Sequence, residues 1–209
     1  MTDHYFNSQP EAIGEYREIT ANLRGTEFRF LADAGVFSKK GIDFGSRLLI
    51  ETVELPDKGE ILDLGCGYGP IGIACAASAP ECRITMVDIN RRAVKLAQEN
   101  ARLNGVQDQV EVVAGDGLSG VRGRSFDLIV TNPPIRAGKK TVYRLFEEAK
   151  SALNPEGELW VVIRKQQGGP SAREKLQSLF TQVETITKKK GFWVLRTKLS
   201  SGIDTRRSL

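Results

Sequence analysis

The sequence is poor in the residues that carry most metal and nucleophilic chemistry. Its 209 residues include one histidine, His4, and three cysteines, Cys66, Cys75 and Cys82. A single histidine near one end excludes histidine-rich zinc sites and argues against Ser-His-Asp or Cys-His catalysis. Three cysteines without metal-ligand spacing predict free thiols in a reducing compartment rather than a disulfide framework. We therefore expect no bound metal and a chemistry carried by other residues.

Long apolar runs are also absent. No stretch approaches the roughly 20 apolar residues that span a bilayer, and residues 1–16 lack the basic flank and apolar core of a secretory signal. A composition of 40% hydrophobic and 27% charged residues is too apolar for a disordered chain and too charged for a membrane protein. These features predict a cytoplasmic protein with no membrane partner, and its length fits one domain around one core.

Charge is divided unequally along the chain. Residues 1–131 contain 14 Lys and Arg against 19 Asp and Glu, a net charge of −5, whereas residues 132–209 contain 16 against 7, a net charge of +9. Clustered cations gain from releasing the counterions held by phosphates, so the asymmetry indicates a polyanionic partner met by C-terminal loops. A solvated basic face is the alternative, and charge alone favours neither.

Short β-branched runs alternate with helical patterns from about residue 57 onward, which is typical of βα units and a mostly parallel sheet. The expected strands are 60–64, 83–88, 110–114, 126–131 and 159–163, and the expected helices are 71–79, 91–104, 141–153 and 172–180. Two β-hairpins are expected at the ends, over 16–31 and over 182–198, with a further helix at about 46–53. The pattern predicts the α/β class.

One motif follows an expected strand and opens an apolar helix, Asp63-Leu-Gly-Cys-Gly-Tyr-Gly69. Glycines are needed where the backbone turns sharply and a ligand must approach main-chain atoms. Gly67, Gly69 and Gly72 also fit the G-x-G-x-x-G dinucleotide pattern, with Asp88 ending the next strand where a ribose-binding acid would lie. The loop therefore predicts a nucleotide-type cofactor and, taken alone, leaves an NAD enzyme open.

The acid at the head of the loop favours a cationic cofactor. Asp63 would repel a pyrophosphate at the helix N-terminus, whereas S-adenosylmethionine has an ammonium and a sulfonium and no phosphate. We expect Asp88 to accept hydrogen bonds from the ribose hydroxyls and Asp116 from the adenine amino group. Three carboxylates then follow three successive strands at the edge where open α/β sheets bind ligands. Each acid taken singly could instead be a helix N-cap.

The motif Asn132-Pro-Pro-Ile135 ends the fourth strand of this series. Two prolines stiffen the main chain and leave the carbonyl of Pro133 without a local donor, while Asn132 adds a side-chain carbonyl. These two acceptors could hold both hydrogens of a planar amino group and align its lone pair with an incoming methyl. No strong base is needed, since the proton is lost after the nitrogen becomes cationic. The NAD alternative fails mainly on Asp63 and on Asn132-Pro-Pro, and the sequence offers no plausible acid for hydride transfer besides His4.

Together, the glycine loop and Asn132-Pro-Pro-Ile135 resemble the class I methyltransferases that modify amino groups. The run Gly35-Val-Phe-Ser38, with Asp43 and Gly45-Ser46, is similar to the methyltransferase small domain proteins related to bacterial 16S rRNA guanine-N2 methyltransferases. The resemblance covers the chain up to about residue 199. It implies a Rossmann-like, seven-stranded, mostly parallel sheet with helices on both faces and an antiparallel last strand. The expected division is an N-terminal β-hairpin extension over 1–45, a methyltransferase domain over 46–200 and a polar tail over 201–209.

The resemblance implies S-adenosylmethionine as cofactor and gives Asn132 and Pro133 the catalytic role of orienting the target amine. The expected cofactor-binding residues are Asp63, Gly65, Cys66, Gly67, Asp88, Ile89, Asp116, Gly117 and Asn132. Cys66 lies inside the glycine loop without a basic partner in the sequence, so we expect a small packing thiol rather than a covalent nucleophile.

Substrate contacts are expected next to the double proline. The expected residues are Phe37, Pro134, Ile135, Arg136 and Lys139. Many relatives have an aromatic residue after the two prolines to stack on the target base, but Ile135 offers only an apolar contact. Phe37 is the candidate for stacking, with core packing as its alternative role. Arg164 and Lys165 follow the fifth strand and are expected at the same rim.

The leading hypothesis is methyl transfer to an exocyclic amine of RNA, guanine N2 in small-subunit rRNA, with naked 16S rRNA or the assembled small subunit as partner. Methylation of a protein glutamine amide is the second hypothesis, because its planar nitrogen poses the same orientation problem. A non-catalytic RNA-binding or assembly factor is the third. The basic C-terminal half favours RNA, although the chain lacks the duplicated N-terminal half of the better-known guanine-N2 enzymes.

Overall fold

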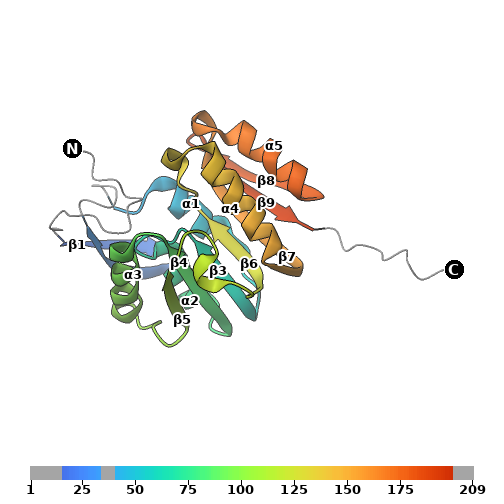
Figure 1. Ribbon diagram of the computed structural model, residues 1–209. Coiled ribbons are helices and arrows are strands. Elements are labelled where there is room, and N and C mark those ends of the chain that lie inside the picture. Colours follow the sequence, from blue (N-terminus) through green and yellow to red (C-terminus); the bar gives the residue numbers. More distant parts are fainter. Residues whose placement is uncertain (1–15, 34–40, 200–209) are drawn as a thin grey trace.

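The central sheet has seven strands in the order β5-β4-β3-β6-β7-β9-β8 (Figure 1). The computed structural model describes residues 16–33 and 41–199. Its sheet contains β3 (Gly59–Leu64), β4 (Cys82–Asp88), β5 (Val110–Ala114), β6 (Phe126–Thr131), β7 (Leu153–Arg164), β8 (Gln182–Lys189) and β9 (Phe192–Lys198). Neighbours from β5 to β7 pair in parallel, and β9 pairs antiparallel with both β7 and β8. The expected sheet, its antiparallel last strand and the terminal hairpin are confirmed.

The strand order reverses between β3 and β6. From β3 the chain proceeds to β4 and β5 on one side, and it then returns to β6 and continues to β7 on the other. In open α/β sheets such a reversal leaves a crevice at the carboxyl ends of the two central strands, because the loops that follow them diverge. This edge of the sheet is therefore where the topology places a ligand site.

Helices cover both faces of the sheet, as expected. The helices are α1 (Phe44–Thr52), α2 (Pro70–Ser78), α3 (Arg91–Leu103), α4 (Lys139–Ser151) and α5 (Gly169–Leu179). Side chains alternate along β3, so Ile61 packs in the apolar cluster of α1, α2 and α3, whereas Leu62 and Leu64 pack in that of α4 and α5. Burial is continuous over residues 70–76 of α2, which explains why the sequence of this helix is apolar all round.

A separate hairpin precedes the sheet, formed by β1 (Tyr16–Leu23) and β2 (Thr26–Asp33). It turns at Arg24 and Gly25, both at positive φ, as two-residue hairpins require. The other edge of β2 lies against α3. Asn100 accepts from the Leu31 amide at 2.7 Å and donates to the Leu31 carbonyl at 2.9 Å, and Asn104 bonds both backbone groups of Arg29. Two side-chain amides therefore pair with the backbone groups of Arg29 and Leu31 on this edge of β2.

Several boundaries differ from those expected. Helix α4 ends at Ser151 rather than 153, and β7 begins at Leu153 rather than 159. Strand β7 already pairs with β6 at Leu153, and the pairing resumes at Glu158, so residues 154–157 loop out between the two points. Pro155 and Gly157 in this bulge hid the early start of the strand. Three short helical turns were not expected: η1 (Ser119–Val121), η2 (Ile135–Ala137) and η3 (Lys165–Gln167).

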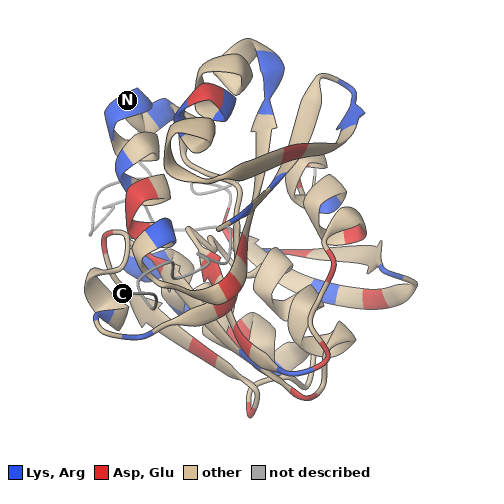
Figure 2. Ribbon diagram, turned by 90° about the vertical axis from the view of Figure 1, so that its right-hand side faces the viewer, with Lys and Arg blue, Asp and Glu red and all other residues tan. Residues whose placement is uncertain are grey.

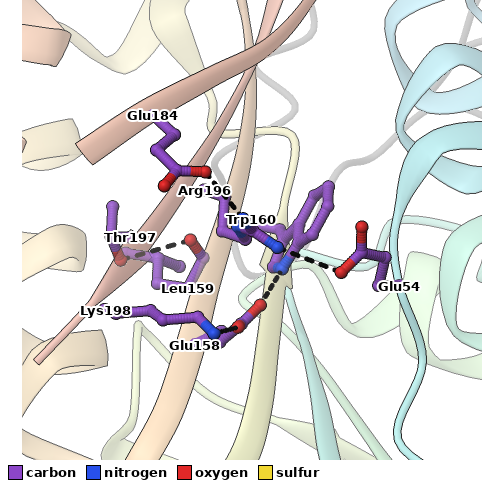
Figure 3. Close-up of polar contacts among 8 residues, drawn as sticks. All are labelled: Glu54, Glu158, Leu159, Trp160, Glu184, Arg196, Thr197 and Lys198. Atoms are coloured by element: carbon purple, nitrogen blue, oxygen red, sulfur yellow. Dashed lines mark hydrogen bonds and ion pairs between the residues drawn. The ribbon is translucent and has the colours of Figure 1, made fainter. Parts of the chain in front are cut away.

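A polar network ties the last strands to the rest of the sheet (Figure 3). The buried Trp160 donates from Nε1 to Glu158 Oε2 at 2.7 Å, and Arg196 bonds Glu54 at 3.0 Å and Glu184 at 2.6 Å. The Arg196 guanidinium lies 5.7 Å from the Trp160 ring centroid, within the range of a cation–π contact. The network joins β7, β8, β9 and the segment after α1, which holds β9 in place. No helix in the described ranges is long and apolar enough to cross a membrane.

Candidate active site

A cavity of about 610 Å³ opens at the carboxyl ends of β3, β4 and β6, where the strand order reverses. Eleven of the predicted site residues line it: Gly65, Cys66, Asp88, Ile89, Asp116, Gly117, Asn132, Pro133, Pro134, Ile135 and Arg136. Asp63, Gly67 and Lys139 do not line it, and Phe37 lies outside the described residues. The structure thus brings the glycine loop, two of the three acids and the double proline to one cavity.

The glycine loop turns through left-handed conformations at Gly65, Gly67 and Gly69, with φ of 79°, 59° and 96°. Its first turn is held by the Val87 carbonyl, which accepts from the amides of Gly65 at 2.8 Å and Cys66 at 3.0 Å. A Cβ built on Gly65 would meet nothing within 4 Å. The backbone there faces open space, so a ligand can approach it without a side chain in the way.

Asp88 connects the end of β4 to this loop. Its Oδ2 accepts from the Gly67 amide at 2.8 Å and its Oδ1 from the Asn90 amide at 2.8 Å. The carboxylate is nearly buried yet lines the cavity. The N-cap of α3 is Asn90, whose side chain accepts from Arg92 N at 2.9 Å. Asp88 is therefore not the helix cap, and it fixes the loop that forms the cavity wall.

Asp63 lies fully buried at the end of β3. Its Oδ2 accepts from the Gly72 amide at 2.8 Å in the first turn of α2, while its Oδ1 has no partner among the described residues. Burial, together with the nearby Asp88 charge, raises the pKa of Asp63 to about 7, although the Gly72 bond opposes the shift. A buried carboxylate with an unpaired oxygen fits a cationic group nearby better than an anionic one.

Asp116 follows β5, and its half-exposed side chain faces the cavity. Arg144 of α4 donates to Asp116 Oδ1 at 2.6 Å and to Glu148 at 2.6 Å, and the Asp116 bond raises the pKa of the Arg144 guanidinium. Glu148 also accepts from the amide of Leu118 at 2.9 Å, which closes the turn after Asp116. Sequence reasoning missed Arg144, because its spacing from Glu148 is that of an ordinary surface pair on a helix.

Asn132 is held by two residues of the segment that begins α1. Its Nδ2 lies 3.0 Å from Ser46 Oγ and 3.2 Å from Asp43 Oδ1. A carboxylate only accepts hydrogen bonds, so the amide nitrogen faces Asp43 and the amide oxygen is turned away from it. Asp43 also caps α1 by accepting from the Ser46 amide at 3.0 Å. Asp43 and Ser46 carried part of the family resemblance, but their role beside Asn132 was not expected.

The double proline is followed by the turn η2, which turns Ile135 and Arg136 toward the cavity. Pro133 is buried, Ile135 is half-buried, and Arg136 is exposed. Lys139 is exposed at the start of α4, outside the lining. Arg164 and Lys165 are exposed where β7 ends. Figure 2 shows the distribution of Lys and Arg over the fold in blue. Cations therefore follow both β6 and β7 at the ligand edge of the sheet.

Other residues in the lining were not expected. Tyr68 and Phe192 contribute rings, and Gln167 of η3 a polar side chain. Burial, with the nearby carboxylates of Asp88 and Asp63, raises the pKa of the Cys66 thiol, which is the opposite of what an activated nucleophile needs. Within residues 16–33 and 41–199, no group of three or more His, Cys, Asp or Glu residues could hold a metal ion.

Relatives of the chain include methyltransferases of ribosomal RNA. The 47% identical Bacillus subtilis protein YbxB aligns over 95% of this chain and 99% of its own length. The small subunit rRNA methyltransferase C of Pasteurella multocida is 39% identical over 75% of this chain and 48% of its own length. The large subunit rRNA methyltransferase G of Streptomyces avermitilis is 38% identical over 78% of this chain and 43% of its own length. The chain spans less than half the length of these two enzymes.

Solved structures share the fold. The Thermus thermophilus 16S rRNA N2 methyltransferase, solved with AdoMet and guanosine, has a TM-score of 0.78 and 24% identity over 88% of this chain and 50% of its own. The ribosomal protein L11 methylase of Lactobacillus delbrueckii has a TM-score of 0.63 and 23% identity over 74% of this chain and 77% of its own. The same fold thus acts on RNA in one neighbour and on protein in another. The family model described as methyltransferase small domain matches residues 27–196, and the chain belongs to this family of class I methyltransferases.

Proposed function

We propose that the protein transfers a methyl group from S-adenosylmethionine to an exocyclic amine of RNA, namely guanine N2 in small-subunit rRNA. The observation that carries this proposal is the orientation of Asn132. Asp43 and Ser46 occupy its amide nitrogen, so its amide oxygen is the atom left to meet an incoming amino group at the cavity. The rRNA methyltransferases among its relatives support RNA as the substrate class.

The residues around the cavity fit S-adenosylmethionine. Gly65 leaves room for close approach of the methionine part to the backbone, and Asp63, whose Oδ1 has no partner among the described residues, stands two residues before it in the chain. Asp88 lines the cavity at the end of β4, where its carboxylate would accept from the ribose hydroxyls. Asp116 would accept from the adenine amino group through Oδ2, since Arg144 occupies Oδ1. The cofactor supplies an electrophilic methyl group that a lone pair can attack directly.

The chain's own part in the reaction is to orient the amine. Asn132 Oδ1 and the Pro133 carbonyl would accept the two hydrogens of the planar amino group, which directs its lone pair along the path of attack. Both acceptors are fixed before substrate binds, Asn132 by its two partners and Pro133 by the stiff double proline. No general base is required, because the proton leaves a nitrogen that has already become cationic.

The choice of RNA over a protein amide is supported by charge. Arg136 lines the cavity, and Lys139, Arg164 and Lys165 are exposed beyond the strands that end at it. Cations at this rim would contact phosphates on either side of a flipped or unpaired base. A substrate in ribosomal RNA would place the protein in the cytoplasm, in contact with the small subunit or its 16S rRNA.

The test is transfer of labelled methyl from S-adenosylmethionine to small ribosomal subunits from cells that lack this gene, with the product nucleoside identified after digestion. Label in N2-methylguanosine is the expected result. Cofactor binding is measured in the same preparation by calorimetry. If the cofactor binds and small subunits stay unlabelled, the substrate assignment is wrong, and large subunits, naked 16S rRNA and protein glutamines are tested next. If the cofactor does not bind, the reaction itself is wrong.

A further inference from the structure

We propose that Phe192 is the residue on which the target base stacks, an inference that rests on the proposed function. The expected place for a stacking ring, directly after the double proline, is taken by Ile135, which has none. Phe192 lies about 60 residues later in the sequence and yet lines the same cavity. Phe192 is only partly buried, so part of its side chain is accessible.

The ring lies next to the group that orients Asn132. A Cβ built on Gly45 would lie 2.8 Å from Phe192 Cε1 and 3.1 Å from Asp43 Oδ1. The Phe192 ring edge and the Asp43 carboxylate therefore both lie close to Gly45, and Asp43 in turn accepts from Asn132 at 3.2 Å. Glycine at position 45 is what allows the ring to come this close. A base held with its amino group at Asn132 would thus have an aromatic surface beside it.

The surroundings of the ring suit a nucleobase flanked by phosphates. Phe44 backs it with a ring centroid 5.7 Å away and an interplanar angle of 49°. Arg164 places its guanidinium carbon 5.7 Å from the Phe192 centroid, and Lys190 places Nζ 5.0 Å from the Phe44 centroid. Aromatic rings next to cations are the combination by which proteins hold unpaired nucleotides. An aliphatic glutamine side chain would gain little from such a wall.

The backbone holds Phe192 in this position. It is the first residue of β9, directly after the hairpin turn at Gly191. The other end of β9 is anchored by Arg196 in the network of Figure 3. Trp193, the next residue, packs in the apolar cluster on the opposite face of the sheet and lies 5.1 Å from Lys188 Nζ. The two adjacent aromatic residues therefore lie on opposite faces of the sheet. Of the two, only Phe192 lines the cavity.

The test compares Phe192→Ala, Phe192→Trp and the control Trp193→Leu in steady-state methylation of the RNA substrate. We expect Phe192→Ala to raise KM for RNA about tenfold or more, the cost of losing one stacked base. Phe192→Trp, which keeps a stacking surface, should remain within a few-fold of wild type. Trp193→Leu should leave KM for RNA unchanged, since that side chain is on the far face. The dissociation constant for S-adenosylmethionine should stay within twofold in all three.

A second variant, Gly45→Ala, tests the stacking role if Phe192→Ala fails to fold. Gly45→Ala places a methyl group 2.8 Å from Phe192 Cε1, so displacement of the ring should raise KM for RNA while Phe192 itself is retained. The same methyl group lies 3.1 Å from Asp43 Oδ1, and a disturbance of Asp43 is recognised separately by a fall in kcat. If wild type transfers methyl and both variants keep the wild-type KM for RNA, the stacking role is wrong and the proposed function stands. If wild type binds the cofactor but methylates no RNA, the proposed function has failed, and the inference fails with it.

Discussion

The side-chain nitrogen of Asn132 lies 3.2 Å from Asp43 Oδ1, across 89 residues of sequence. This contact fixes the orientation of the amide, and in the proposed function it determines which end meets the substrate. It also explains why the segment that begins α1 belongs to the site, since Asp43 both caps that helix and faces Asn132. Without the carboxylate, the amide of Asn132 could rotate and present its nitrogen to the target amine, where a donor would meet donors.

Replacing Asp43 should therefore slow turnover without weakening cofactor binding. We expect Asp43→Ala and Asp43→Ser each to lower kcat ~10-fold, because orientation of the acceptor is lost. Serine caps helices about as well as aspartate, so only the alanine variant should lose stability, by about 1 kcal/mol. Steady-state kinetics and denaturant titration of both variants check this. Wild-type kcat in Asp43→Ser would show that the carboxylate does not orient Asn132.

Removal of the acceptor itself should have a larger effect. Asn132→Ala is expected to lower kcat by ~100-fold or more while the cofactor dissociation constant changes little. Single-turnover kinetics at saturating cofactor, with calorimetric binding in parallel, measure the two quantities separately. Equal losses in kcat and in cofactor affinity would instead identify Asn132 as a cofactor residue.

Because Asp88 accepts two backbone hydrogen bonds, we predict that no neutral residue at this position preserves cofactor affinity. Asp88→Ala should weaken cofactor binding by roughly 1 to 3 kcal/mol, since charge-assisted bonds are lost and the glycine loop is released. Asp88→Asn should be similarly affected, because its amide nitrogen would face an N–H of Gly67 or Asn90. Calorimetric titration of both variants provides the measurement. Normal affinity in Asp88→Asn would contradict the assigned role.

The raised pKa of Asp63 has a consequence for stability. Its pKa rises from 3.8 in the unfolded chain to about 7 in the fold, so the native state binds more protons between pH 4 and 7. The free energy of unfolding should therefore fall as the pH rises through this window, by on the order of 4 kcal/mol at most. Below about pH 4 the loss of stability caused by ionisation of Asp63 is absent, and above about pH 7 it is complete.

The comparison is with Asp63→Asn, which cannot titrate. Urea denaturation of both proteins at half-unit intervals from pH 4.5 to 8 should show that the stability of wild type relative to the variant decreases as the pH rises. Groups other than Asp63 titrate in both proteins and cancel in the difference. Parallel stability curves would show that the carboxyl ionises in the fold as readily as in water.

Asn100 joins the N-terminal hairpin to the glycine loop, because its Nδ2 donates to the Tyr68 carbonyl at 2.8 Å as well as to Leu31. Its removal leaves buried backbone groups unpaired, so Asn100→Ala should lower the free energy of unfolding by about 2 to 4 kcal/mol. Asn104→Ala is the matched control, since its bonds to Arg29 are exposed and water can replace them. If the two variants lose similar amounts of unfolding free energy, the bond from Asn100 to the Tyr68 carbonyl does not contribute more to stability than the exposed bonds of Asn104.

Local motifs predicted much of the fold. Alternating β-branched runs and glycine-ended helices located the strands from β3 to β6 within about one residue. For β3, β4 and β6 the apolar runs reflect burial on both faces of the sheet, whereas β5 is a partly exposed edge strand. The start of β7 was missed since Pro155 and Gly157 lie inside a bulge rather than in a loop. No local pattern signals such a bulge, which depends on pairing with β6.

The site was predictable where motifs follow strands and not where contacts span the chain. The glycine loop, Asp88, Asp116 and the double proline converge on one cavity because parallel strands end at one edge. Arg144 and Phe192 come from elements whose relation to that edge depends on how α4 and β9 pack. The residue boundaries of the extension, the methyltransferase domain and the tail stay predictions, as do the roles of the individual site residues.

The amides of Asn100 and Asn104 also determine how the hairpin behaves toward other molecules. A strand with a free edge is a template on which a second chain can add a strand, which leads to swapping or aggregation. In this protein α3 occupies the edge of β2 with side-chain groups that imitate a neighbouring strand. Self-association through β2 would first require α3 to detach, and that would break the Asn100 bond to the glycine loop. Protection against self-association and support of the cavity therefore depend on the same helix.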